Sequence, residues 1–120
     1  MTRMTKSIIA AVFGLGLAAS AALAGPEGTY KVEGKAPDGS SYSGTAVVSA
    51  SGQTFKVVWT LGKEKYIGTA VGNDDFFAVT YDAGGSAHGL AVYGRKDDGW
   101  MGVWTMSGDT KVGAEKLTRK

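Results

Sequence analysis

The amino-acid sequence predicts an all-β fold: a single antiparallel up-and-down meander of about eight strands that forms a closed or nearly closed small barrel. Short runs in which large and variable residues alternate recur along the chain after residue 27, and turn-forming residues separate them. The chain has no cysteine, so its core must be stable without disulfides. Closure into a barrel favours this because it removes the open sheet edges.

Residues 1–24 have the layout of a secretory signal peptide. Arg3 and Lys6 give a positive start, residues 8–19 form an apolar segment, and residues 22–24 read Ala-Leu-Ala, a typical cleavage site. The apolar run is short for a membrane span. We therefore expect export to the periplasm or outside a bacterial cell. The mature chain is expected to be a β-barrel domain of residues 25–120 with no transmembrane segment.

Removal of this segment changes the charge of the protein. The whole chain has 13 Lys and Arg residues against 11 Asp and Glu residues, and loss of Arg3 and Lys6 leaves 11 of each. A mature protein close to neutral gives no reason to expect binding to nucleic acid or to an anionic membrane surface.

The first two strands are expected at residues 28–34 and 41–50. The first reads Gly-Thr-Tyr-Lys-Val-Glu-Gly and alternates with period two. Between the two strands, Pro37 precedes Asp38 and Gly39. Proline supplies a fixed φ and glycine a left-handed position, as a turn requires.

The three central strands are the most regular part of the sequence. Residues 55–59 and 77–81 both have the form Phe-x-Val-x-aromatic, and Tyr-Ile-Gly-Thr-Ala lies between them at residues 66–70. The pattern predicts consecutive antiparallel strands at residues 53–61, 65–71 and 76–82.

The last three strands are expected at residues 87–95, 100–107 and 110–118, joined by tight turns at 96–99 and 108–109. A sandwich stays open as an alternative to the barrel. A transmembrane barrel is disfavoured because it needs strands of about 9–11 residues and an apolar band that faces lipid. Here the second face carries lysines and threonines.

Strand parity assigns one face to the interior. Gly44, Gly68 and Gly102 fall on this aromatic face, where they leave room for rings from neighbouring strands. The other interior residues are expected to be Tyr30, Val32, Tyr42, Ala46, Val48, Phe55, Val57, Trp59, Leu61, Tyr66, Ala70, Phe77, Val79, Tyr81, Leu90, Val92, Trp100, Trp104, Met106 and Leu117.

Catalytic and metal-binding patterns are weak in this sequence. His88 is the single histidine, and without cysteine the usual zinc site of three or four ligands is hard to assemble. The segment around Ser86 does not have the Gly-x-Ser-x-Gly spacing of a nucleophile elbow. We expect no metal, no cofactor and no enzyme activity.

Glu115 is the most informative polar residue, because it shares parity with Gly113 and Leu117 and is expected to face the interior. A carboxylate there is costly unless it is hydrogen-bonded. It can hold tyrosine hydroxyls and tryptophan N–H groups, or it can anchor a ligand. A register slip that turns it outward is the third possibility.

The aromatic residues of the same face carry a similar ambiguity. They can line a cavity, but in so small a barrel we expect them to fill it. These residues are Tyr42, Trp59, Tyr66, Tyr81, Trp100 and Trp104.

The sequence resembles a mostly uncharacterised group of small exported bacterial proteins, some of which carry a fibronectin-binding label. The resemblance rests on the pattern Gly-x-Tyr-x-Val-x-Gly at residues 28–34, Pro-Asp-Gly at 37–39, Tyr-x-Gly at 42–44 and Gly-x-Glu-x-Leu at 113–117. It implies an adhesin-like surface role. The architecture also resembles the calycins, the lipocalin and avidin barrels. Tyr30 stands at the place of the lipocalin tryptophan, and Arg119 at that of their closing arginine.

The sequence therefore favours an exported, non-enzymatic β-barrel that binds either a small apolar ligand inside or a protein partner outside. The alternative is a small enzyme, of hydrolase or cyclase type, with an interior site around Glu115, or one that uses His88. The candidate ligand-binding residues are Glu115, Trp59, Trp104, Tyr42 and Tyr66.

Overall fold

Eight antiparallel strands follow one another in the computed structural model, which describes residues 25–84 and 86–120. The predicted signal peptide, residues 1–24, lies outside the described residues. The strands are β1 (Gly28–Lys35), β2 (Ser41–Ser51), β3 (Thr54–Leu61), β4 (Glu64–Gly72), β5 (Phe76–Asp82), β6 (His88–Lys96), β7 (Gly99–Met106) and β8 (Gly113–Arg119).

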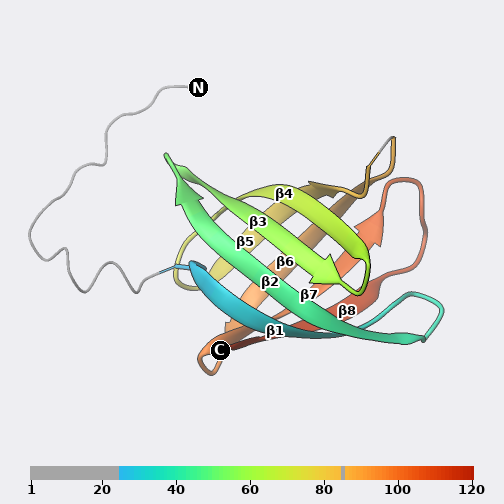
Figure 1. Cartoon of the computed structure of the whole chain (residues 1–120), viewed down its shortest axis with the longest axis horizontal. Coiled ribbons are helices and arrows are strands. Elements are labelled where there is room, and N and C mark those ends of the chain that lie inside the picture. The colour runs from blue at the N-terminus through green and yellow to red at the C-terminus, as the bar shows by residue number, and fades with distance from the viewer. Residues whose placement is uncertain (1–24, 85) are drawn as a thin grey trace, which may run out of the picture.

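The strands form a closed barrel, which confirms the predicted meander and excludes the sandwich. Each strand pairs with the next, and β1 pairs with β8 to close the sheet, with Val32 opposite Leu117. Figure 1 shows β1 and β8 side by side at the seam, although they lie at opposite ends of the described chain. Seven strands match the predicted bounds to within one residue at either end.

The last strand is shorter than the sequence pattern predicted. It begins at Gly113 instead of residue 110, and residues 107–112 form a loop. The chain turns at Gly108, which has a φ of 91°, and the amide of Asp109 donates to the Met106 carbonyl at 2.9 Å. The Thr105 hydroxyl then donates to the Lys111 carbonyl at 2.9 Å, which holds the loop outside the β7–β8 ladder.

The interior face was predicted correctly for seven strands and wrongly for β6. Leu90 and Val92 are 47% and 46% exposed, while Gly89, Ala91 and Tyr93 face inward. The prediction placed the aliphatic side chains of Leu90 and Val92 inside. The structure instead needs a glycine inside at position 89, because the Tyr81 ring lies where a Cβ on Gly89 would be.

The outward side chains of β5, β6 and β7 form a largely uncharged face; its ionisable residues are Asp82 and His88 at one end and Lys96 at the other. Its large apolar members are at least 44% exposed: Phe76, Leu90, Val92, Met101 and Val103. The outward residues of β1, in contrast, include Lys31, Glu33 and Lys35.

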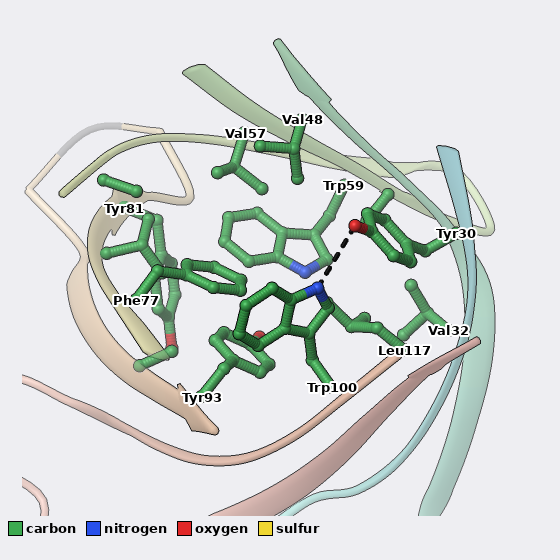
Figure 2. Packing of buried hydrophobic residues seen from close by; sticks show 14 residues of the cluster. Tyr30, Val32, Val48, Val57, Trp59, Phe77, Tyr81, Tyr93, Trp100 and Leu117 are labelled. Atoms are coloured by element: carbon green, nitrogen blue, oxygen red, sulfur yellow. Dashed lines mark hydrogen bonds between the residues drawn. The ribbon is translucent and has the colours of Figure 1, made fainter. Parts of the chain in front are cut away.

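One end of the barrel is filled by side chains, and Figure 2 shows Trp100, Tyr30 and Phe77 close together in the buried cluster. Trp100 is fully buried; its Nε1 donates to the Tyr30 hydroxyl at 3.1 Å, and Tyr30 donates in turn to the Pro26 carbonyl at 2.7 Å. Phe77 meets Trp100 edge to face, with the ring centroids 4.8 Å apart. Because Pro26 is itself buried, the residues that precede β1 help to close this end.

Two arginines cover the packed end. The Arg119 guanidinium lies 5.0 Å from the centre of the Tyr30 ring and donates to the Glu27 carbonyl at 2.8 Å. The Arg95 guanidinium lies 4.2 Å from the centre of the Trp100 ring. Each guanidinium therefore lies over an aromatic ring of the packed end.

Candidate functional site

The opposite end of the barrel holds a cavity of about 560 Å³. Its mouth lies between the β1–β2, β3–β4 and β5–β6 connections, where Ser40, Gly62 and Ala83 contribute to the rim. The wall is built mainly from inward-facing aromatic side chains: Tyr42, Trp59, Tyr66, Tyr81, Tyr93 and Trp104. The aromatic face therefore fills the barrel at one end and lines a cavity at the other.

Glu115 lies at the base of the cavity and is only 5% exposed. Its Oε1 accepts a hydrogen bond of 2.7 Å from the Tyr42 hydroxyl. Its Oε2 accepts two, at 3.0 Å from Trp59 Nε1 and at 2.5 Å from the Tyr93 hydroxyl. The predicted interior position of Glu115 is confirmed, as are its expected tyrosine and tryptophan donors.

The strand register explains how two tyrosines reach this carboxylate. Around the barrel wall, Tyr42 on β2 pairs with Gly34 on β1, and Gly34 pairs with Glu115 on β8. On the other side Glu115 pairs with Gly102 on β7, which pairs with Tyr93 on β6. Each tyrosine thus crosses one glycine to reach Glu115, and a Cβ on either glycine would collide with the ring.

The same arrangement of a ring over a glycine occurs at two further positions on the cavity wall. Tyr81 pairs with Gly89, and Trp104 pairs with Gly113. In both pairs the ring occupies the place that a Cβ on the glycine would take. Because the rings lie over glycines, they follow the barrel wall, and the centre of this end stays open.

All five sequence-predicted site residues lie on the cavity wall: Tyr42, Trp59, Tyr66, Trp104 and Glu115. Sequence analysis missed Tyr93, because it assigned the outward-facing residues of β6 to the interior. One signal could have found it: the short turn at Asp97 and Asp98 sets Tyr93 opposite Gly102. Residues that pair directly share a face, and Gly102 was predicted to face inward.

The surroundings of the wall tyrosines keep them protonated. Burial, followed by the negative charge of Glu115, raises the pKa of Tyr42, Tyr81 and Tyr93 above its ordinary value of 10.0. Burial, followed by a hydrogen bond to Glu64, raises the pKa of Tyr66. The hydroxyls of Tyr42 and Tyr93, which donate to Glu115, and of Tyr66, which donates to Glu64, therefore remain donors through the neutral and mildly alkaline pH range.

Alkaline titration is expected to unfold the protein as these tyrosines ionise. Their unfolded-state pKa lies near 10, so their contribution to stability is complete below about pH 10. It is lost as the pH rises toward the higher folded-state pKa, by about 1.4 kcal/mol per pH unit for a fully buried tyrosine such as Tyr93. Phenolate absorbance and near-ultraviolet circular dichroism, followed together, should change in one step. The free energy of unfolding of a Tyr93→Phe variant should fall less per pH unit than that of the wild type. Equal falls in the two proteins would contradict this role of Tyr93.

His88 does not belong to the cavity. Its Nδ1 contacts Oδ1 of Asp82, directly opposite on β5, and both side chains are more than 60% exposed. An exposed pair of this kind contributes little to stability. Within residues 25–84 and 86–120, no group of three His, Asp or Glu side chains is arranged to hold a metal ion.

Comparisons with known proteins match the fold. No protein-family model and no curated protein matches this chain, so membership of the exported bacterial group stays a prediction. Two solved designed barrels are similar. One, a de novo designed fluorescence-activating β-barrel, has a TM-score of 0.60 at 14% identity, and the match covers 78% of this chain and 93% of that one.

The other is the redesigned barrel mFAP1, bound to DFHBI, with a TM-score of 0.62 at 23% identity; the match covers 82% of this chain and 97% of that one. At these identities the likeness shows a shared barrel fold. The described part of the chain contains no helix with the length and apolar character needed to cross a membrane.

Proposed function

We propose that the protein is an exported, non-enzymatic barrel that binds a small, largely apolar ligand in the cavity above Glu115. The observation that carries the proposal is the division of the interior. Trp100 and Tyr30 pack one end solid, while the other end keeps about 560 Å³ between aromatic walls. Ligand sites in proteins are typically cavities of about 300–1,000 Å³ with apolar walls and a few fixed polar groups.

Stability alone gives no reason for this arrangement. An unfilled cavity forfeits packing energy, and a buried carboxylate costs desolvation energy even when it is hydrogen-bonded. Both costs arise at the same end of the barrel, because the buried carboxylate of Glu115 lies at the base of the cavity. A binding role accounts for both, since a ligand needs open space and polar groups that are already held in position.

The similar barrel mFAP1 supports the proposal by analogy, because its structure is described as bound to DFHBI. A barrel of this architecture can therefore accommodate a small molecule. The analogy concerns the fold, and the identity of a ligand for this chain must come from its own residues.

A neutral, environment-sensitive naphthalene dye is expected to brighten and shift to shorter wavelengths when the protein is added. Ala83 lies on the rim, and Ala83→Trp should block the mouth and abolish the response. Thr69 is exposed on β4 outside the cavity wall, so Thr69→Trp is the matched control and should respond like the wild type. Equal responses from the two variants would overturn the cavity as the binding site.

A protein partner is the second candidate, favoured by the largely uncharged outer face of β5–β7. It would account for the adhesin-like role that the resemblance implied. If no dye binds in the cavity and Leu90→Lys on that face abolishes capture of a partner, this candidate replaces the first.

A catalytic role for Glu115 is less well supported. Its two oxygens already accept three hydrogen bonds, which fix the carboxylate rather than leave it free for proton transfer. Export rests on the predicted signal peptide. Mass spectrometry of the exported protein should find Gly25 at its N-terminus.

A further inference from the structure

The charge on the cavity wall has one sign. Among the described residues, the ionisable acids and bases that line the cavity, tyrosines aside, are two carboxylates, Glu115 at the base and Glu64 at the rim. The Tyr66 hydroxyl donates to Glu64 at 2.9 Å and ties the rim carboxylate to the aromatic wall. A ligand that enters the barrel thus passes one acidic group and stops at another.

The carboxylate at the base has no positive partner within the part of the chain that the structure describes. Its three donors, Tyr42, Trp59 and Tyr93, are all neutral groups. Hydrogen bonds spread the charge of a buried acid but do not cancel it, and in a medium of low polarity that charge acts over a longer distance.

The aromatic side chains above Glu115 stand at steep angles to one another. The Trp59 and Tyr81 rings are 5.3 Å apart with 59° between their planes, and the Tyr66 and Tyr81 rings are 6.1 Å apart at 77°. On the other side, Tyr42 and Trp104 are 6.1 Å apart at 71°. The faces of such rings carry partial negative charge and attract cations, as in the aromatic cages that bind quaternary ammonium groups.

We propose that the ligand is an organic cation with an apolar body, whose methylated ammonium group lies among these rings and above Glu115. This inference rests on the proposed function and specifies its ligand class. The cation supplies the positive charge that the buried carboxylate lacks. A methylated ammonium fits better than a primary one, because three donors already occupy most of the lone pairs of Glu115.

Two probes of nearly identical shape test the charge preference. Benzyltrimethylammonium carries a quaternary nitrogen where neopentylbenzene has a carbon atom. Binding can be followed by the fluorescence of Trp59 and Trp104, which both line the cavity. The cation is expected to bind wild-type protein at least about tenfold more tightly than the neutral probe, as is typical of a desolvated cation–π site.

Removal of the base carboxylate should reduce this preference to the part that the rings supply. Glu115→Gln is expected to lower the affinity for the cation, relative to the affinity for the neutral probe, about tenfold. Glu33→Gln is the matched control: it also removes one negative charge, but Glu33 is exposed and lies outside the cavity wall. It should bind both probes like the wild type.

The outcomes separate this inference from the function on which it rests. If wild-type protein binds the neutral probe as tightly as the cation, the inference is overturned, while dye binding blocked by Ala83→Trp still upholds a ligand cavity. If neither the dye nor either probe binds, both fail. The wild-type comparison decides the question even if Glu115→Gln does not fold.

Discussion

Trp100→Ala is expected to lower the free energy of unfolding by about 3–5 kcal/mol, a large part of the roughly 5–15 kcal/mol that stabilises a small domain. The indole is fully buried and packs against Phe77. Its loss leaves a void at the packed end and removes the donor to the Tyr30 hydroxyl. The midpoint of chemical denaturation measures the effect.

Trp104→Ala provides the matched control, because it makes the same change four residues further along the inner face of β7. Trp104 is only partly buried and borders the cavity, and its Nε1 has no hydrogen-bond partner in the described part of the chain. Its truncation enlarges an existing space, so we expect less than half of the loss seen for Trp100→Ala. Equal losses would contradict the division of the barrel into a packed end and an open end.

The second large effect is expected at Glu115. Glu115→Leu removes the acceptor for three donors, and Trp59 and Tyr93 are too deeply buried to find water instead, at 4% and 2% exposed. The free energy of unfolding should fall by about 1–3 kcal/mol for an unpaired buried group. Glu115→Gln keeps an acceptor of similar shape and should cost less. A Leu variant as stable as the wild type would reject this account of the network.

A combined variant tests whether unpaired donors cause the loss. Adding Tyr42→Phe and Tyr93→Phe to Glu115→Leu removes two of the three donors together with their acceptor. Replacing both partners of a hydrogen bond by apolar groups is close to neutral. The combined variant should therefore regain part of the stability that Glu115→Leu loses, and the thermodynamic cycle gives the coupling energy.

The fold could be predicted because its signals are local. Alternation with period two and the turn residues defined seven strands, and parity with Leu117 placed Glu115 inside. The same rule failed on β6, where Leu90 and Val92 look like core residues. There the inner residue Gly89 had to be a glycine to receive the Tyr81 ring, and a requirement set by a neighbouring strand is not visible in the strand itself.

The site could be predicted only in part for a related reason. Parity found the aromatic residues and Glu115, but it could not show which rings fill the barrel and which line a cavity. That distinction depends on register across the seam between β1 and β8, where Gly34 pairs with Glu115 although most of the barrel sequence lies between them. Local sequence patterns carry no information about such a pairing.

The ring–glycine pairs have a consequence for how this barrel can diverge in evolution. Gly34 and Gly102 need not touch a ligand, yet each sets the path of a tyrosine that does line the cavity. One added methyl group at Gly34 would displace the Tyr42 ring and reshape the space above Glu115, while a methyl group at Gly102 would displace the Tyr93 ring and also press on the Val92 carbonyl. A descendant could therefore acquire a new ligand with every cavity-lining side chain unchanged. Comparisons restricted to those side chains would miss the positions that decide selectivity.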